Sequence, residues 1–197
     1  MNGLRIPEGM GQNVRIISGS RRGHKLFEFE GEDIRPTTDR VKESIFNMIQ
    51  FYISGANVLD LFAGSGALAF EAVSRGAAHA VLVDQDKRSV ALEERNLRAL
   101  RFDKQAEIVQ ADVFSYLKSR SEAFDIIFMD PPYNQGYVEP VLDAVCRYNA
   151  LKPGGIVVLE TDETDEPSEH KELTALKRRK YGRSVITVFE RRQEGQA

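Results

Sequence analysis

The residues Asp130, Pro131, Pro132 and Tyr133 end an apolar run at 124–129 that reads as a buried strand. A carboxylate and a proline carbonyl can together hold the two hydrogens of an exocyclic amino group, because proline fixes the backbone that carries the carbonyl. The tyrosine ring offers a face on which a nucleobase can stack. A base inside a duplex cannot enter such a turn. The four residues therefore predict a catalytic pocket for an unpaired guanine or adenine.

A second chemical motif, Gly64, Ser65 and Gly66, follows the apolar run 58–62 and precedes a helical pattern. Asp84 comes about 20 residues later, where a carboxylate that binds a ribose is expected. This spacing fits both NAD and S-adenosylmethionine, because each of them carries an adenosine ribose.

The position of Asp60 separates these two cofactors. It lies inside the strand that leads to the glycines, where its charge would repel the pyrophosphate of NAD. S-adenosylmethionine instead brings a sulfonium and an ammonium group, both cationic, so the sequence favours it. Asp112 can accept a hydrogen bond from the adenine amino group, or it can cap the helix that follows.

Alternating strands and helices from residue 56 onward predict a parallel sheet with helices on both faces. Strands are expected at 58–62, 80–83, 106–109, 124–129 and 156–159, with helices at 66–75, 87–100, 113–118 and 138–148. A strand order of 3-2-1-4-5 would place the glycine loop opposite Asp130. Residues 152–155 are predicted to form a turn, and 173–191 an antiparallel hairpin.

The N-terminal part divides into three predicted segments. Residues 1–13 read as a flexible arm, residues 14–29 as a β-hairpin, and the residues after Thr38 as a helix with Ile45 and Phe46 on its apolar face. We therefore expect an N-terminal extension at 14–54 and a catalytic domain at 55–197.

Composition narrows the class of protein. Of 197 residues, 42% are hydrophobic and 29% are charged, which is typical of a globular protein. No apolar run reaches the length of a membrane helix. The single Cys146 suits a reducing cytoplasm, and three scattered histidines do not predict a metal site.

The net charge of −3 is unevenly distributed. Residues 160–172 are strongly acidic, so the rest of the chain is net positive. One basic cluster holds Arg15, Arg21, Arg22 and Lys25, and another holds residues 177–180 with Arg183. Each cluster is either a solvated face or, if an active site lies between the two, a contact for nucleic acid.

The sequence VLDLFAGSG at 58–66, together with DPPY, resembles the class I S-adenosylmethionine-dependent amino methyltransferases. Residues 15–19, 22–23 and above all RPTTDRVKESIF at 35–46 resemble the bacterial RsmD family of 16S rRNA guanine-N2 methyltransferases. The resemblance covers roughly residues 14–191. It implies an α/β, Rossmann-like fold with a seven-stranded, mostly parallel sheet whose last strand is antiparallel, preceded by a small hairpin and helix extension.

The resemblance also implies roles for individual residues. The residues implied to act in catalysis are Asp130, Pro131, Pro132 and Tyr133. The residues implied to bind the cofactor are Thr38, Arg40, Asp60, Phe62, Gly64, Ser65, Gly66, Asp84, Asp112 and Val113. RNA contacts fall to Arg15, Arg21, Arg22, Lys25 and Arg35. Asp84 stands where many members of the family have glutamate, and residues 1–13 precede the usual start.

The implied partner is 16S rRNA or a small-subunit assembly particle, with guanine 966 as the target and a cytoplasmic monomer as the enzyme. A DNA adenine-N6 methyltransferase is an alternative, although the chain has no obvious target-recognition domain. A non-catalytic RNA-binding assembly factor is another, against which the intact DPPY and cofactor acids argue. An NAD oxidoreductase is disfavoured by Asp60.

Overall fold

The computed structural model describes residues 14–29, 39–120, 122–165 and 167–192. The arm at 1–13, Arg35 and Thr38 lie outside the described residues. The helices are η1 (Gly19–Arg21), α1 (Asp39–Met48), η2 (Gln50–Tyr52), α2 (Ala67–Ser74), α3 (Lys87–Leu100), α4 (Val113–Ser119) and α5 (Val138–Arg147). The strands are β1 (Asn57–Leu61), β2 (His79–Asp84), β3 (Ala106–Gln110), β4 (Phe124–Met129), β5 (Leu151–Asp162), β6 (Leu173–Tyr181) and β7 (Ser184–Arg191).

The described strands form one seven-stranded sheet in the order β3-β2-β1-β4-β5-β7-β6. The first five run parallel, whereas β7 is antiparallel to both β5 and β6. The predicted fold class and the order 3-2-1-4-5 are therefore confirmed. The order reverses between β1 and β4, which pair from Val58 with Ile126 to Leu61 with Met129.

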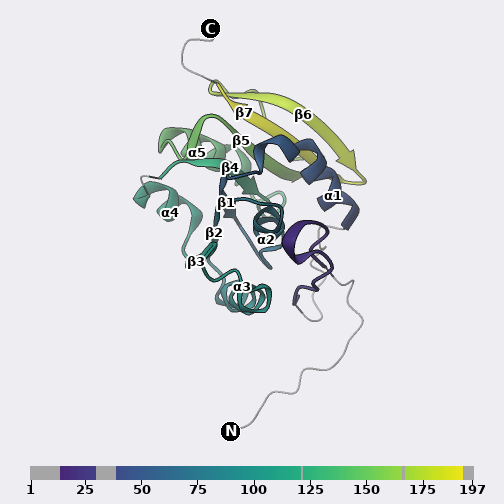
Figure 1. The fold of residues 1–197 in the computed structure, drawn as a ribbon. Helices are drawn as coiled ribbons and strands as arrows, with labels where there is room; N and C mark the ends of the chain where they lie inside the picture. Colours follow the sequence, from purple (N-terminus) through teal and green to yellow (C-terminus); the bar gives the residue numbers. More distant parts are fainter. Residues whose placement is uncertain (1–13, 30–38, 121, 166, 193–197) are drawn as a thin grey trace.

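Apolar side chains fill a core on each face of the sheet. Helices α1, α2 and α3 lie on one face, and α4 and α5 lie on the other (Figure 1). The first core includes Phe46 and Phe128, whose ring centroids are 5.8 Å apart. The second includes Leu142 and Val145 of α5. Both faces of the central strands are buried, which explains their continuous apolar runs.

Residues 152–155 do not form the predicted turn. Leu151 is already paired with Phe124, and the register shifts before Ile156 pairs with Ile126. The four residues are thus an irregularity inside β5. A side chain at Gly155 would lie 2.9 Å from the Lys152 carbonyl oxygen, so glycine permits the two segments to approach closely.

The N-terminal hairpin is less regular than expected. Its two sides meet in one bridge, between Arg15 and Lys25, and a 3-10 turn joins them. Val14, Ile16 and Leu26 are buried in the same core as α1 and α2. The predicted boundary at residue 54 therefore crosses a shared core, although the hairpin can still have a function of its own.

Candidate active site

A cleft of about 750 Å³ opens beyond the carboxyl ends of β1, β2 and β4, where the strand order reverses. Eleven residues predicted for catalysis or cofactor binding line it: Asp60, Phe62, Gly64, Ser65, Asp84, Asp112, Val113, Asp130, Pro131, Pro132 and Tyr133. Residues separated by up to 73 positions in the chain thus share one cavity, as the strand order requires.

The glycine loop is held to the end of β2 by Asp84. The Gly64 amide donates to Asp84 Oδ2 at 3.0 Å, and the Asp86 amide donates to Asp84 Oδ1 at 2.8 Å. Gly66 is not among the cleft residues. It has φ of +75°, and a Cβ there would lie 2.5 Å from the Phe70 ring and 2.6 Å from Leu82. Gly66 therefore packs α2 against β2.

Phe62 carries backbone strain at the floor of the loop. Its φ is +64°, a backbone angle that residues other than glycine rarely adopt. The ring meets that of Tyr137 edge-on, with centroids 5.4 Å apart, and both residues line the cleft. Such strain tends to occur at functional sites.

Asp60 is the buried charge of the site. Its Oδ2 accepts a hydrogen bond from the Ala69 amide at 3.1 Å. Burial, with a smaller contribution from the nearby Asp84, raises the pKa of Asp60 to about 7. A cation in the cleft would favour the ionised form, whereas a pyrophosphate would oppose it. The carboxylates of Asp60 and Asp84 thus fit a cofactor that carries a cationic sulfonium.

Asp112 caps helix α4, because its Oδ1 accepts a hydrogen bond from the Ser115 amide at 3.0 Å. It also lines the cleft beside Val113. The capping role is confirmed, and the contact with adenine stays a prediction that this position allows.

Asp130 follows β4 at the centre of the cleft. Burial raises the pKa of Asp130 well above its usual range, and Glu160 and Asp60 add to this effect. The Tyr133 hydroxyl donates to Glu160 Oε1 at 3.3 Å, and burial raises the pKa of Tyr133 as well. The turn thus presents a carboxyl group and an oriented ring toward one space.

Several residues at the site were not predicted for it, and three of them bear on the chemistry. Glu160 comes from β5, Tyr137 precedes α5, and Arg183 lies in the turn between β6 and β7. Arg183 pairs with Asp162 at 3.1 Å, and both line the cleft. Strand pairing brings them there, and the basic cluster that includes Arg183 was the only sequence signal.

The other predicted residues that the structure describes are not among those that line the cleft. Arg40 is exposed in the first turn of α1 and is not among the lining residues. Arg15 pairs with Asp39 at 2.8 Å. Arg21 donates to the Leu100 carbonyl at 2.6 Å, so it anchors the hairpin to the end of α3. Arg22 and Lys25 are exposed.

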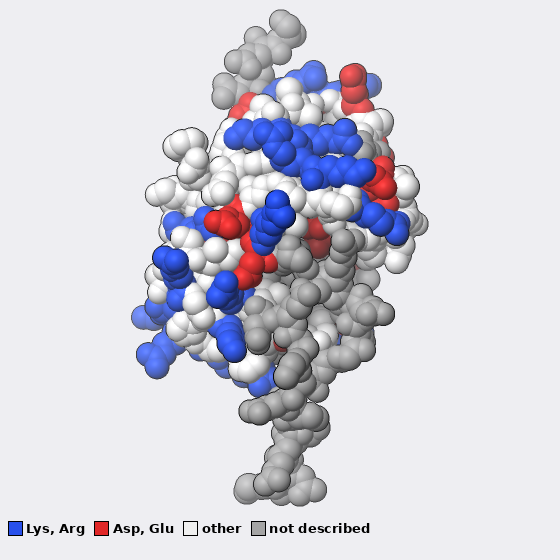
Figure 2. Space-filling model, turned by 90° about the vertical axis from the view of Figure 1, so that its right-hand side faces the viewer, with Lys and Arg blue, Asp and Glu red and all other residues white. Residues whose placement is uncertain are grey.

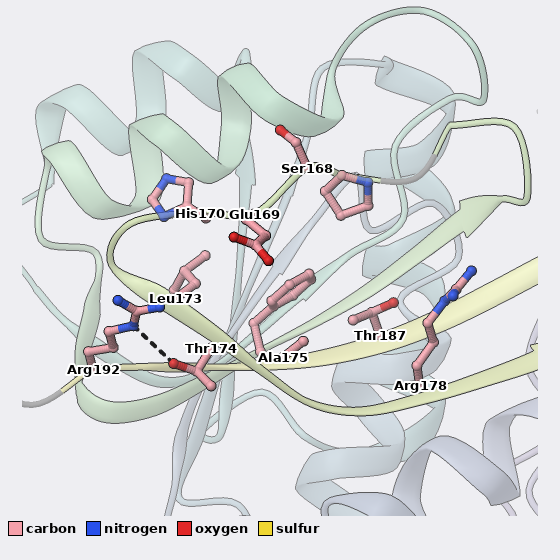
Figure 3. A pocket seen from close by; sticks show the side chains of 11 residues that line it. Ser168, Glu169, His170, Leu173, Thr174, Ala175, Arg178, Thr187 and Arg192 are labelled. Carbon is pink, nitrogen blue, oxygen red and sulfur yellow. Dashed lines mark hydrogen bonds between the residues drawn. The ribbon is translucent and has the colours of Figure 1, made fainter.

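A second hollow, of about 380 Å³, lies beside β6 and β7 and contains no residue predicted for the site (Figure 3). His170 at its rim is 4.0 Å from the Cys146 sulfur and 3.2 Å from Asp143 Oδ1. Burial raises the pKa of the Cys146 thiol to about 12, so this group is not an activated nucleophile.

Two further findings concern metals and membranes. Within the described ranges, no three His, Cys, Asp or Glu side chains are grouped so that they could hold a metal ion. In the same part of the chain, no helix is long and apolar enough to cross a membrane.

Glu93 of α3 is buried behind the glycine loop. Neither of its carboxyl oxygens has a hydrogen-bond partner among the described residues. Its neighbour one turn on, Asn96, donates to the Ser65 carbonyl at 2.9 Å. Burial raises the pKa of Glu93 to about 9, with Asp84 and Asp60 adding to the shift.

We predict that Glu93→Gln stabilises the protein at pH 8 but not at pH 4. In the folded state Glu93 keeps its proton up to about pH 9, while the unfolded chain loses it near pH 4.3. Stability therefore falls as pH rises through this window. The amide removes that loss, for a gain of roughly 5 kcal/mol at pH 8. Urea unfolding at both pH values measures it, and an equal effect at both would contradict the prediction.

The fold and the cleft define a class I methyltransferase, whose cofactor is S-adenosylmethionine. A family model described as Conserved hypothetical protein 95 matches residues 14–190. The chain therefore belongs to this family, which is the RsmD family that the sequence resembles.

Individual relatives agree with this assignment. The YlbH protein of Bacillus subtilis is 38% identical over 183 residues, which cover 91% of this chain and 100% of YlbH. Ribosomal RNA small subunit methyltransferase D of Haemophilus influenzae is 39% identical, over 85% of this chain and 87% of that protein. The solved structure of yhhF from Escherichia coli is 30% identical, with a TM-score of 0.84 over 92% of this chain and 99% of that one.

Proposed function

We propose that the chain transfers a methyl group from S-adenosylmethionine to the exocyclic N2 amino group of a guanine in 16S ribosomal RNA. The observation that carries this proposal is that the glycine loop, the acids Asp60 and Asp84 beside it, and the turn from Asp130 to Tyr133 line one cleft. The relative named Ribosomal RNA small subunit methyltransferase D supports the choice of substrate, and guanine 966 is the finer form of the same proposal.

The cofactor supplies an electrophilic methyl group on a sulfonium. Asp84 would hold its ribose hydroxyls, and Asp112 with Val113 would hold its adenine. Asp60 would attract the cationic amino-acid end, and the ionised carboxylate would become more favourable there. Gly64 and Ser65 of the glycine loop line the same cleft and complete the proposed cofactor site.

The DPPY turn prepares the amino group. A nucleobase amine is a poor nucleophile, because its lone pair is delocalised into the ring. Asp130 and the Pro131 carbonyl accept its two hydrogens, so the nitrogen is held in one orientation. Tyr133 stacks on the base while Glu160 holds the tyrosine hydroxyl. Asp130, whose pKa is raised by burial, then accepts the proton that the amine releases.

The RNA would be held first by the N-terminal extension. Arg22 and Lys25 are exposed on the hairpin, whose residues Val14 and Phe29 reach the cleft. Arg15 and Arg21 belong to the same proposed surface, although the hydrogen bond from Arg21 to the Leu100 carbonyl restrains that side chain. Arg35 lies outside the described residues, and its RNA contact stays a prediction from the sequence. We propose a cytoplasmic monomer that acts on 16S rRNA or on an assembling small subunit.

A methyl-transfer assay tests this function. The purified protein is incubated with tritiated S-adenosylmethionine and either naked 16S rRNA or small subunits from a strain that lacks its own family member. Mass mapping of the product is expected to find N2-methylguanine at one position. Absence of label on any guanine would overturn the proposal. Label on adenine in duplex DNA would favour a DNA methyltransferase, and failure to bind S-adenosylmethionine in calorimetry would favour a non-catalytic RNA-binding factor.

A further inference from the structure

Strand β6 forms the edge of the sheet and carries four consecutive cations, Lys177, Arg178, Arg179 and Lys180. All four are exposed. We call them the basic ridge. Lys and Arg side chains gather in the upper part of the face seen in Figure 2, where β6 lies in Figure 1. The proposed function assigns no role to this surface.

The pairing with β7 shows which way the ridge residues face. Lys177 pairs with Val188 and Arg179 with Ile186, and both partners are buried in the core on the α1 face. Cross-strand partners share a face, so Lys177 and Arg179 lie on the same face as α1 and the N-terminal hairpin. Arg178 lies on the other face, beside Thr187 (Figure 3).

Neither Lys177 nor Arg179 is neutralised within the described residues. Lys177 Nζ donates to the Met48 carbonyl at 2.8 Å, and Arg179 Nη1 donates to the Arg178 carbonyl at 3.0 Å. Both acceptors are uncharged. Adjacent like charges on one strand repel each other, and an anionic partner would remove that repulsion.

Edge charges can also serve to prevent strands of two molecules from pairing. That role is met by isolated charges of either sign. It does not require four cations in a row, nor a position next to a nucleic-acid cleft. The two explanations differ in one consequence, because acidic replacements would keep the edge charged and yet repel phosphate.

The ridge leads into the active-site cleft. Strand β6 ends at Tyr181, and the turn that follows contains Arg183, which lines the cleft with Tyr133. The Tyr181 hydroxyl is hydrogen-bonded to Ser44 of α1, so this end of the strand is fixed on the α1 face. A strand of RNA lying along the ridge would therefore deliver a base to the DPPY turn.

We propose that the basic ridge binds the phosphate backbone of the substrate RNA next to the base that enters the cleft. This inference rests on the proposed function, since it extends the RNA surface from the hairpin to the opposite side of the active site. It assigns the two basic clusters of the sequence to two sides of one binding surface.

The test uses the full chain and a fluorescein-labelled single-stranded RNA oligonucleotide. Binding of the parent is compared with that of Lys177→Gln/Arg179→Gln at several KCl concentrations. Loss of two phosphate contacts should flatten the slope of log K against log salt by about 1.4, and should weaken binding at low salt by roughly 10-fold. Lys104→Gln/Lys118→Gln is the matched control, because both lysines are exposed and lie outside the ridge and the cleft.

The pair Lys177→Glu/Arg179→Glu separates RNA binding from edge protection. It should stay monomeric in size-exclusion chromatography and bind RNA more weakly than the glutamine pair. Thermal unfolding and calorimetry with S-adenosylmethionine show that fold and cofactor site are intact. If the parent binds RNA and transfers methyl groups, and the ridge variant binds RNA as the control does, the proposal for the basic ridge alone is overturned. A parent that neither binds nor methylates RNA overturns the proposed function, and the ridge with it.

Discussion

Asp130→Ala is expected to reduce methyl transfer by roughly 10²–10⁴-fold while leaving the affinity for S-adenosylmethionine nearly unchanged. Asp130 lies in the turn after β4, whereas the acids proposed to bind the cofactor come from the ends of β1, β2 and β3. Truncation therefore removes an acceptor for the amino group and leaves the cofactor contacts in place. Single-turnover transfer and calorimetry measure the two quantities separately.

Asp130→Asn separates two roles of the carboxyl group, which are to accept a hydrogen bond from the amino group and to accept its proton. The amide keeps one acceptor oxygen for the amine but cannot take its proton. Because the pKa of Asp130 is raised by burial and by Glu160, the rate of the parent should rise with pH above the usual carboxyl range, and Asn should remove this rise. Asp103→Ala, at an exposed position, is the control. A large loss of cofactor affinity in Asp130→Ala would show that the residue belongs to the cofactor site instead.

The sequence predicted the parts of the site that local motifs encode. The glycine loop and the DPPY turn can each be recognised from a few consecutive residues, and the alternation of strands and helices then predicts that they lie close together. Glu160 and Arg183 were not assigned to the site, because their positions depend on β5 pairing with β4 and on β7 pairing with β5. Such pairings join residues that are distant in sequence, and one sequence does not encode them as a motif.

Some residues predicted for the site also have a packing role that the sequence pattern did not indicate, and their functional roles stay predictions. Gly66 matched the loop pattern, yet its positive φ and the nearby Phe70 ring give it a structural reason to be glycine. Arg21 matched the basic cluster, yet its guanidinium binds the Leu100 carbonyl. Pattern alone cannot separate these uses, because helix packing and ligand binding favour the same residues at a loop next to a helix.

Buried charge was the least predictable feature. Lys42 falls within a helical pattern that predicts an apolar face around Ile45 and Phe46, and both Lys42 and Glu71 of α2 are fully buried. Glu71 accepts hydrogen bonds from the amides of Ile17 at 2.7 Å and Ser18 at 3.0 Å. This carboxylate therefore joins the N-terminal hairpin to the methyltransferase core.

Glu71 is also the charge partner of two cations. Its Oε1 is 2.6 Å from Arg75 Nε, and its Oε2 is 3.8 Å from Lys42 Nζ. Lys42 donates to the Arg15 carbonyl as well. Burial lowers the pKa of Lys42, and Glu71 opposes that shift. Removal of Glu71 would leave a buried ammonium with no carboxylate in contact and two hairpin amides without their acceptors.

Glu71→Ala is therefore expected to lower the free energy of unfolding by about 3–5 kcal/mol in urea titrations at pH 7. Glu71→Leu/Lys42→Met should cost less than the single change, because the fully buried ammonium is then removed together with its carboxylate, whereas Arg75 loses that carboxylate in both variants. Glu94→Ala, on an exposed face of α3, should have little effect. A loss below about 1 kcal/mol in Glu71→Ala would mean that other contacts hold the hairpin.

The pH dependence of Glu71→Ala checks the cause. Without Glu71 the folded state holds Lys42 at a lower pKa than the unfolded chain, whose lysines titrate near pH 10.4. The unfolded state then binds more protons between these two values, so the stability of Glu71→Ala rises with pH in that window. The deficit relative to the parent should shrink as pH increases toward 10. A deficit that stays constant with pH would assign the loss to the hairpin amides rather than to the buried ammonium.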